Sequence, residues 1–157
     1  MKIGIVIYSQ SGITAKVAKT LASALSAKGH DVYTTLLRTI GKVKPGSTDF
    51  EIRNAPSPDE FDAIVVAGPV WAFTINSVIL KYVRGLGKLS GKKALCFVTK
   101  GLPFLWTGGG RALKALEAEL SLSDAILQPG VIINRMKTGK DDTLRPYIEQ
   151  MVDALSS

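Results

Sequence analysis

The sequence predicts an α/β fold, a three-layer α/β/α sandwich built on a five-stranded parallel sheet of strand order 2-1-3-4-5. Apolar runs recur along the chain, and most are followed by a helical pattern, which is typical of parallel strands joined by helical crossovers. The first run, residues 2–8, is almost continuously apolar, as expected for a strand buried on both faces. Right-handed crossovers leave few arrangements of five such strands, and 2-1-3-4-5 is a common one.

The other elements follow from the same patterns. The helix expected at 13–28 carries an apolar stripe at helical spacing, and Gly29 closes it as a C-cap. Residues 41–58 contain proline and glycine with little periodicity and predict a long loop, with a degraded helix as the alternative. Pro129 and Gly130 interrupt the last strand, which places it at the edge of the sheet. The remaining strands are expected at 31–37, 61–67, 93–99 and 125–133, and the remaining helices at 75–84, 110–120 and 142–155.

Length and composition limit the class of protein. The 157 residues suit one domain, which we expect to span 1–157, and 46% hydrophobic residues can fill its core. No apolar stretch approaches the roughly 20 residues that a membrane helix needs, so we expect no membrane span and a cytoplasmic protein. The net charge is +7, but the basic residues are scattered and match no nucleic-acid-binding motif, so no nucleic-acid partner is expected. Cys96 lies in an apolar run and is expected to be a buried free thiol.

The turn between the first strand and the first helix has the composition of a phosphate-binding loop. Three hydroxyl side chains and a run of backbone amides would converge there on one anion, helped by the positive end of the helix. We expect the glycine to let the backbone approach the anion without a Cβ in the way. The alternative is an ordinary Ser/Thr helix cap, which needs fewer hydroxyls. The loop consists of Ser9, Gln10, Ser11, Gly12, Ile13 and Thr14.

Competing phosphate motifs fail on spacing or position. Residues 87–93 resemble a Walker loop, but they are one residue short, lack the Ser/Thr that holds magnesium, and precede a strand. The dinucleotide pattern G-x-G-x-x-G is absent. A phosphate held by amides and hydroxyls, with no lysine or arginine in the loop, suits a permanently bound monoester better than a nucleotide that is hydrolysed.

The residues of this loop resemble the flavin phosphate loop of flavodoxins and flavodoxin-like reductases, usually Ser/Thr-x-Thr/Ser-Gly-x-Thr. Residues 66–73 (VAGPVWAF) resemble the second flavin loop, and 99–103 fall where the third loop follows the fourth strand. The resemblance covers essentially the whole chain and implies the flavodoxin-like fold with FMN as cofactor. Besides the first loop, it implies flavin contacts from Pro69, Val70, Trp71, Ala72, Phe73, Thr99, Lys100 and Gly101.

Aromatic residues near these loops suit a flat, largely apolar flavin ring. Trp71 and Phe73 would stack on the ring, or alternatively plug the top of the core, and Trp106 would form a lid. Ala72 and Phe73 stand where many electron carriers have glycine or aspartate. We therefore do not expect this loop to flip a peptide bond when the flavin changes its redox state.

Charge is unevenly distributed along the chain. All 13 acidic residues fall outside residues 1–30 and 63–116, which contain every predicted flavin loop and carry four and eight basic residues, respectively. A positive rim, to which Lys100 and Arg111 would contribute, favours an anionic reduced flavin and attracts an anionic reductant such as NAD(P)H.

Three functions follow as hypotheses. The first is an FMN-dependent oxidoreductase that passes electrons from NAD(P)H or a protein donor to a small acceptor such as a quinone, with no catalytic acid or base and no metal. The second is a one-electron carrier that serves a redox partner protein. The third is a flavin-free binding or regulatory domain. The sequence leaves both a monomer and a homodimer open.

Overall fold

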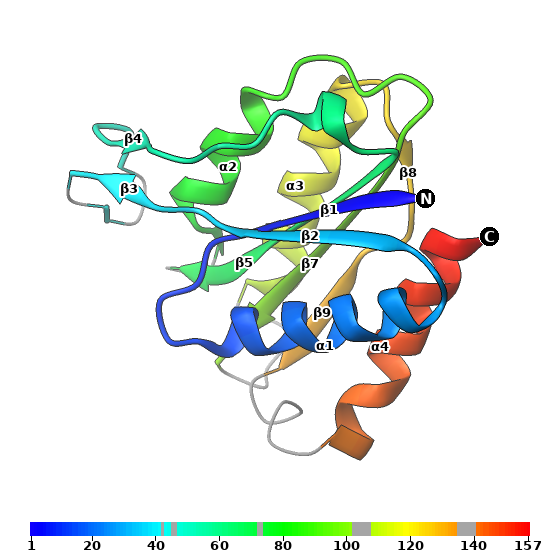
Figure 1. The fold of residues 1–157 in the computed structure, drawn as a ribbon. Coiled ribbons are helices and arrows are strands. Elements are labelled where there is room, and N and C mark those ends of the chain that lie inside the picture. Colours follow the sequence, from blue (N-terminus) through cyan, green and yellow to red (C-terminus); the bar gives the residue numbers. More distant parts are fainter. Residues whose placement is uncertain (42, 45–46, 72–73, 102–107, 135–140) are drawn as a thin grey trace.

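A parallel sheet runs through the centre of the molecule (Figure 1). The structure is a computed structural model that describes residues 1–157 except 42, 45–46, 72–73, 102–107 and 135–140. Its main strand order is β2-β1-β5-β7-β8, and β9 also pairs in parallel with β7. Because β8 and β9 together form the fifth strand, the predicted order 2-1-3-4-5 is confirmed. The strands of this path are β1 (Lys2–Ile7), β2 (Asp31–Leu36), β5 (Ala63–Trp71), β7 (Lys93–Lys100), β8 (Ile126–Leu127) and β9 (Val131–Asn134).

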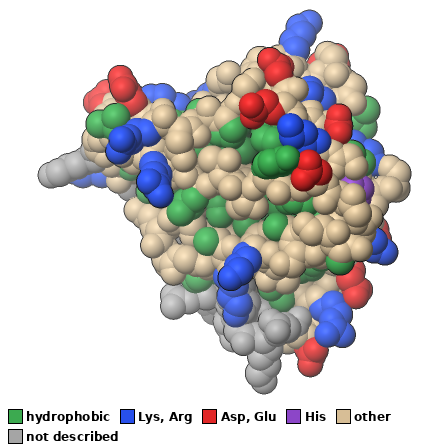
Figure 2. Space-filling model, in the orientation of Figure 1, with side chains coloured by type: hydrophobic (Ala, Val, Ile, Leu, Met, Phe, Trp, Pro, Cys, Tyr) green, Lys and Arg blue, Asp and Glu red, His purple; other side chains and the backbone are tan. Residues whose placement is uncertain are grey.

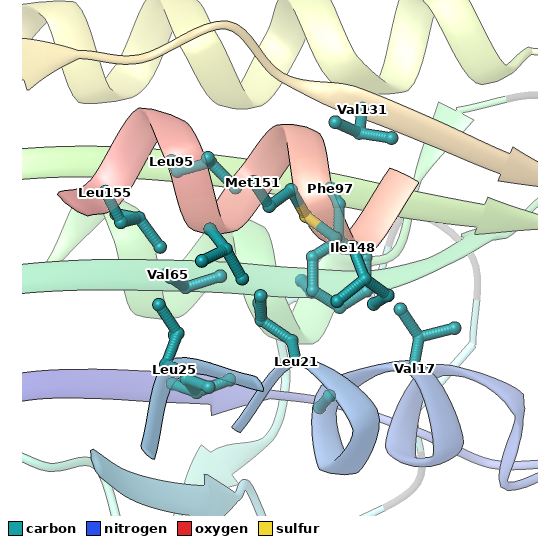
Figure 3. Close-up of a cluster of buried hydrophobic side chains, with 14 of the residues drawn as sticks. Val17, Leu21, Leu25, Val65, Leu95, Phe97, Val131, Ile148, Met151 and Leu155 are labelled. Atoms are coloured by element: carbon teal, nitrogen blue, oxygen red, sulfur yellow. The ribbon is translucent and has the colours of Figure 1, made fainter. Parts of the chain in front are cut away.

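Helices cover both faces of the sheet. On one face, α1 (Ile13–Ala27) and α4 (Asp141–Ser156) bury a shared cluster against the strands. Figure 3 shows its side chains, with Leu21 and Leu25 from α1 and Met151 from α4 pointing towards Val65 of β5. On the other face, α2 (Ser77–Arg84) and α3 (Gly109–Leu122) cover a second cluster. Within the described residues, no helix has both the length and the apolar character that crossing a membrane requires.

Two predicted boundaries change in ways that affect the functional site. The third strand was expected to end at residue 67, but β5 continues to Trp71 and pairs in antiparallel fashion with β6 (Thr74–Ile75). The last strand is split at Pro129 and Gly130, as predicted, because proline cannot donate to the ladder. A short 3-10 turn, Pro58–Glu60, precedes β5.

The segment predicted as a long loop contains a small antiparallel ribbon. Its strands are β3 (Thr39–Ile40) and β4 (Glu51–Ile52), which pair with each other and extend from the end of β2 (Figure 1). The alternative of a degraded helix is wrong for the described residues of this segment. Strands of two residues give no periodicity that a sequence pattern can detect, so the ribbon could not be predicted.

The predicted burial of Cys96 is confirmed. Cys96 lies on β7 with no exposed surface, inside the cluster beneath α2 and α3. Burial, with a smaller contribution from the charge of Glu117, raises the pKa of this thiol to about 12. The thiol is therefore protonated at neutral pH and sealed from solvent.

We therefore expect Cys96 in the native protein to resist alkylation by iodoacetamide at pH 8, because the reactive species is the thiolate. The same protein in denaturing urea should label to one equivalent within minutes. Mass spectrometry of the two samples measures the difference. Rapid labelling of the native protein would show that β7 is exposed in solution.

Candidate functional site

The carboxyl ends of β1, β5 and β7 bring the predicted loops to one edge of the sheet. In the parallel register, Ile7 of β1 lies beside Ala67 of β5, and Pro69 of β5 lies beside Thr99 of β7. The loops that follow these three strands therefore begin next to one another (Figure 1). Ligands of open parallel sheets bind at this edge, next to the point where the strand order reverses.

The first loop presents backbone N–H groups around the hydroxyl of Ser9. The Ser9 Oγ accepts hydrogen bonds from the amide of Gly12 at 3.2 Å and from the amide of Ala15 at 3.4 Å. Gly12 is the N-cap of α1 and supplies no side chain, and the first turn of the helix holds no acidic residue. In this loop the amides at the positive end of α1 are thus bonded to a neutral hydroxyl and not to a carboxylate. The positive end of the helix dipole therefore remains available to an anion.

Gly12 is also favoured by the backbone conformation of the turn, in addition to the predicted close approach to an anion. Among the described protein atoms, a Cβ at this position would meet none within 4 Å. Its φ of 87° lies in the left-handed region, which a residue with a Cβ adopts only at a cost. The glycine therefore sets the turn that aims the amides.

Gly12→Ala should lower the free energy of unfolding by about 1–2 kcal/mol, which is the strain of one left-handed alanine without any steric clash. Urea unfolding measures this change. Gly110→Ala is the control, because Gly110 lies in α3 with open space around it and should gain stability from alanine. An equal effect of both substitutions would contradict the assignment of strain to the turn.

A buried pair of threonines links the first and third loops. The Oγ1 atoms of Thr14 and Thr99 are 2.8 Å apart, and both residues are almost fully buried. Either hydroxyl donates to the other, so the mutual bond uses one of the two hydroxyl hydrogens. The pair therefore retains a hydrogen that does not take part in this bond, at the junction of α1 and β7.

The second loop is a hairpin whose aromatic side chain is held in place. Trp71 ends β5 opposite Thr74 of β6, and its ring meets the ring of Tyr8 edge-to-face at 5.5 Å. Tyr8 directly follows β1, so this contact joins the first and second loops. Trp71, Pro69 and Val70 are all half-buried. The predicted residues Ala72 and Phe73, like Trp106, lie outside the described residues.

Asn76 is a residue of this site that the sequence analysis missed. Its buried side chain accepts a hydrogen bond from the amide of Ile79 at 2.9 Å, which caps α2. Its Nδ2 donates to the carbonyl of Pro69 at 3.0 Å, which fixes the second loop. Gly68 makes room for this amide, because a Cβ on Gly68 would overlap Nδ2. An asparagine directly before an apolar helical pattern is the N-cap signal that could have identified it.

In the third loop, Lys100 is a buried cation and Gly101 is exposed. The aliphatic stem of Lys100 passes beside α3, where a Cβ on Gly109 would lie 3.1 Å from its Cδ. In the first loop, Gln10 and Ser11 are exposed and Ile13 is half-buried. The described residues from all three predicted loops therefore meet at one edge.

The acidic residues lie mainly away from this edge. Asp31, Asp62 and Asp124 stand at or just before the starts of β2, β5 and β8, which is the opposite end of the sheet. The exceptions by topology are Asp141 and Asp142, which begin α4 after β9, and Asp49 and Glu51, which lie in the ribbon segment that follows β2. Asp142 is exposed and lies 3.5 Å from the guanidinium of Arg145. Lys100 thus places a basic side chain next to the loops, while Asp142 shows that this side of the sheet also carries negative charge.

Comparisons with known proteins extend the similarity in fold over the whole chain. No protein-family model matches the sequence, and no curated protein matches it significantly. Among solved structures, a flavodoxin from Streptococcus pneumoniae has a TM-score of 0.74 at 14% identity, covering 99% of this chain and 98% of its own. An oxidised flavodoxin from Bacillus cereus gives 0.74 at 16% identity, with coverages of 99% and 97%.

A larger protein contains the same fold as one part of its chain. The flavodiiron protein from Giardia intestinalis has a TM-score of 0.67 at 19% identity, covering 99% of this chain but 35% of its own. At these identities the likeness concerns architecture, and it agrees with the strand order and the position of the loops. The chain has the flavodoxin-like fold.

Proposed function

We propose that this protein binds FMN at the three loops and transfers electrons through it. The observation that carries the proposal is the first loop, where Ser9 and the amides of Gly12 and Ala15 form a neutral cradle at the positive end of α1. This donor set suits a phosphate monoester, since each phosphate oxygen accepts several hydrogen bonds. The flavodoxins and the flavodiiron protein of the same fold support the choice of FMN.

The phosphate would replace Ser9 as the acceptor for the loop amides. The hydroxyls of Ser9 and Ser11 would then turn to donate to it, and the Thr14–Thr99 pair would supply the hydrogen that its mutual bond leaves over. No carboxylate belongs to this loop, so no like charge opposes the phosphate.

The flavin ring would lie between the second and third loops. The indole of Trp71 offers an aromatic face or edge that the Tyr8 ring already holds in one orientation, so little side-chain entropy is lost on binding. Asn76 fixes the backbone of the same loop through the carbonyl of Pro69. We include Ala72 and Phe73 in the proposed site because of their place between Trp71 and Thr74 in the sequence.

When bound, the flavin supplies the redox chemistry, and the chain supplies binding, orientation and charge. Lys100 would hold a positive charge beside the ring, which stabilises negative charge on it. We assign no general acid or base to the described residues. The finer proposal is a reductase that takes electrons from NAD(P)H and delivers them to a small acceptor such as a quinone.

A one-electron carrier is the second candidate, and the flavodoxins among the structural neighbours favour it. Anaerobic stopped-flow mixing of the FMN-loaded protein with NADPH separates the two candidates. The reductase predicts bleaching of the flavin absorbance much faster than for free FMN, and a potentiometric titration in a single two-electron step. Bleaching no faster than free FMN, with two resolved one-electron steps, would favour the carrier. A protein that takes up no FMN at all would leave the flavin-free binding domain.

A further inference from the structure

An open groove with two arginines lies at the edge strand β2, apart from the three predicted flavin loops. Arg38 and Arg53 line this groove of about 410 Å³ together with hydroxyl and amide side chains. None of the described residues that line it is acidic. These described residues are Thr34, Thr35, Leu36, Arg38, Arg53 and Asn54.

The backbone holds the two arginines side by side. The amide of Arg53 donates to the carbonyl of Arg38 at 2.8 Å, next to the register of β3 with β4. Asn54 completes the arrangement, because its Oδ1 accepts from the amide of Arg38 at 2.7 Å and its Nδ2 donates to the carbonyl of Leu36 at 2.8 Å. These hydrogen bonds therefore fix the backbone of both arginines. The repulsion between the two like charges is overcome during folding and does not have to be overcome again when an anion binds.

Neither guanidinium is neutralised by the part of the chain that the structure describes. The ion pairs found there join Arg84 with Glu119 and Arg145 with Asp142, and no described carboxylate lies within ion-pair distance of Arg38 or Arg53. The nearest acid in sequence, Glu51, lines a different groove beside Tyr82. Figure 2 shows Lys and Arg side chains over the corner of the molecule where Figure 1 draws β3 and β4, with Asp and Glu side chains at the tip of the same corner.

We propose that this groove binds a phosphate monoester. Two guanidinium groups carry two positive charges and two planar sets of N–H donors, which match a dianion with three terminal oxygens. Thr34 and Thr35 line the same groove, and a threonine hydroxyl there would add a neutral donor. A carboxylate would leave one of the two cations without a partner.

The groove adjoins the edge of the sheet where the three loops lie. Leu37, the residue before Arg38, donates its amide to the carbonyl of Ile7 at 2.8 Å, and Ile7 is two residues before Ser9. If a nucleotide bound this groove through its phosphate, that phosphate would lie one strand away from the first loop. A 2′-phosphorylated electron donor is one source of such a phosphate, and this identification alone rests on the proposed function.

The test is an NMR titration of the ¹⁵N-labelled protein, with and without saturating FMN. The ligands are inorganic phosphate, adenosine 2′,5′-bisphosphate and adenosine 5′-monophosphate. The amides of Arg38 and Arg53 report on the groove, and the amides of Gly12 and Ala15 report on the first loop. We expect all three ligands to shift the groove amides in the presence of FMN, with the bisphosphate tightest if the groove serves a 2′-phosphorylated donor.

Matched variants separate a site from general positive charge. Arg38→Gln with Arg53→Gln should raise the dissociation constant at the groove by about tenfold or more. Lys28→Gln with Lys88→Gln removes the same charge from exposed positions at the opposite end of the sheet and should change it less than twofold. Groove amides that do not shift, or shifts that survive the arginine substitutions, would overturn the proposal. If FMN fails to move the amides of Gly12 and Ala15, the proposed function fails while the groove remains tested by its own amides.

Discussion

Gly68→Ala is expected to lower the free energy of unfolding by about 1–3.5 kcal/mol. A Cβ at this position overlaps Nδ2 of Asn76, so the asparagine must leave its site. The departure removes the cap of α2, worth about 0.5–2 kcal/mol. It also removes the hydrogen bond that the half-buried carbonyl of Pro69 accepts from Asn76, at about 0.5–1.5 kcal/mol. Urea unfolding followed by circular dichroism measures the sum.

A double-mutant cycle identifies the mechanism. Asn76→Ala should cost about as much as Gly68→Ala, because it removes the same two hydrogen bonds. Together the two substitutions should cost much less than their sum, since the methyl group of alanine fits the space that the asparagine vacates. Additive effects would mean that Gly68 acts through another contact, such as the Cγ2 atom of Ile79, which would lie 3.4 Å from its Cβ.

Thr14→Val is expected to weaken FMN binding by about 10- to 100-fold, because a hydrogen bond to a charged phosphate contributes about 1.5–3 kcal/mol. Valine keeps the shape of threonine at this buried position but removes its hydroxyl. Quenching of FMN fluorescence on titration with protein measures the affinity. Thr20→Val is the control on the same helix, since its hydroxyl donates to the carbonyl of Lys16 within that helix and its loss should leave FMN affinity unchanged.

The double variant Thr14→Val with Thr99→Val distinguishes an effect on stability from an effect on FMN affinity. The single substitution strands the hydroxyl of Thr99 in the core, at about 1–3 kcal/mol of stability. Replacing both partners with apolar groups of the same shape removes that cost and should restore stability. FMN affinity should stay low in the double variant. Recovery of affinity together with stability would show that the pair has only a structural role.

Sequence patterns predicted the fold because they report burial on both faces. The almost continuous apolar run of β1 and the helical stripe of α1 each allow one interpretation, and both elements lie within one residue of their predicted bounds. The handedness of the crossovers then left few strand orders, and the predicted one is common among them. The β3–β4 ribbon has two-residue strands and no such pattern, so the groove of Arg38 and Arg53 was also beyond prediction.

The sequence predicted which residues form the candidate site, but not which of them contact one another. Ser9, Gly12 and Thr14 follow from the composition of the first loop, yet the partner of Thr14 is Thr99, 85 residues away. Only the register of β5 with β7 and the packing of α1 place these hydroxyls together. The role of Asn76 likewise depends on the continuation of β5 to Trp71, which carries the carbonyl of Pro69 to the start of α2.

The most direct test compares FMN with riboflavin, which carries the same ring without the phosphate. If the first loop binds phosphate, the protein should bind FMN about a hundredfold more tightly than riboflavin, as expected when two or more charge-assisted hydrogen bonds are gained. Thr14→Val should narrow that ratio by lowering the affinity for FMN alone. Equal affinities for the two flavins, or no quenching by either, would contradict the assignment of the Ser9–Thr14 loop as a flavin phosphate site.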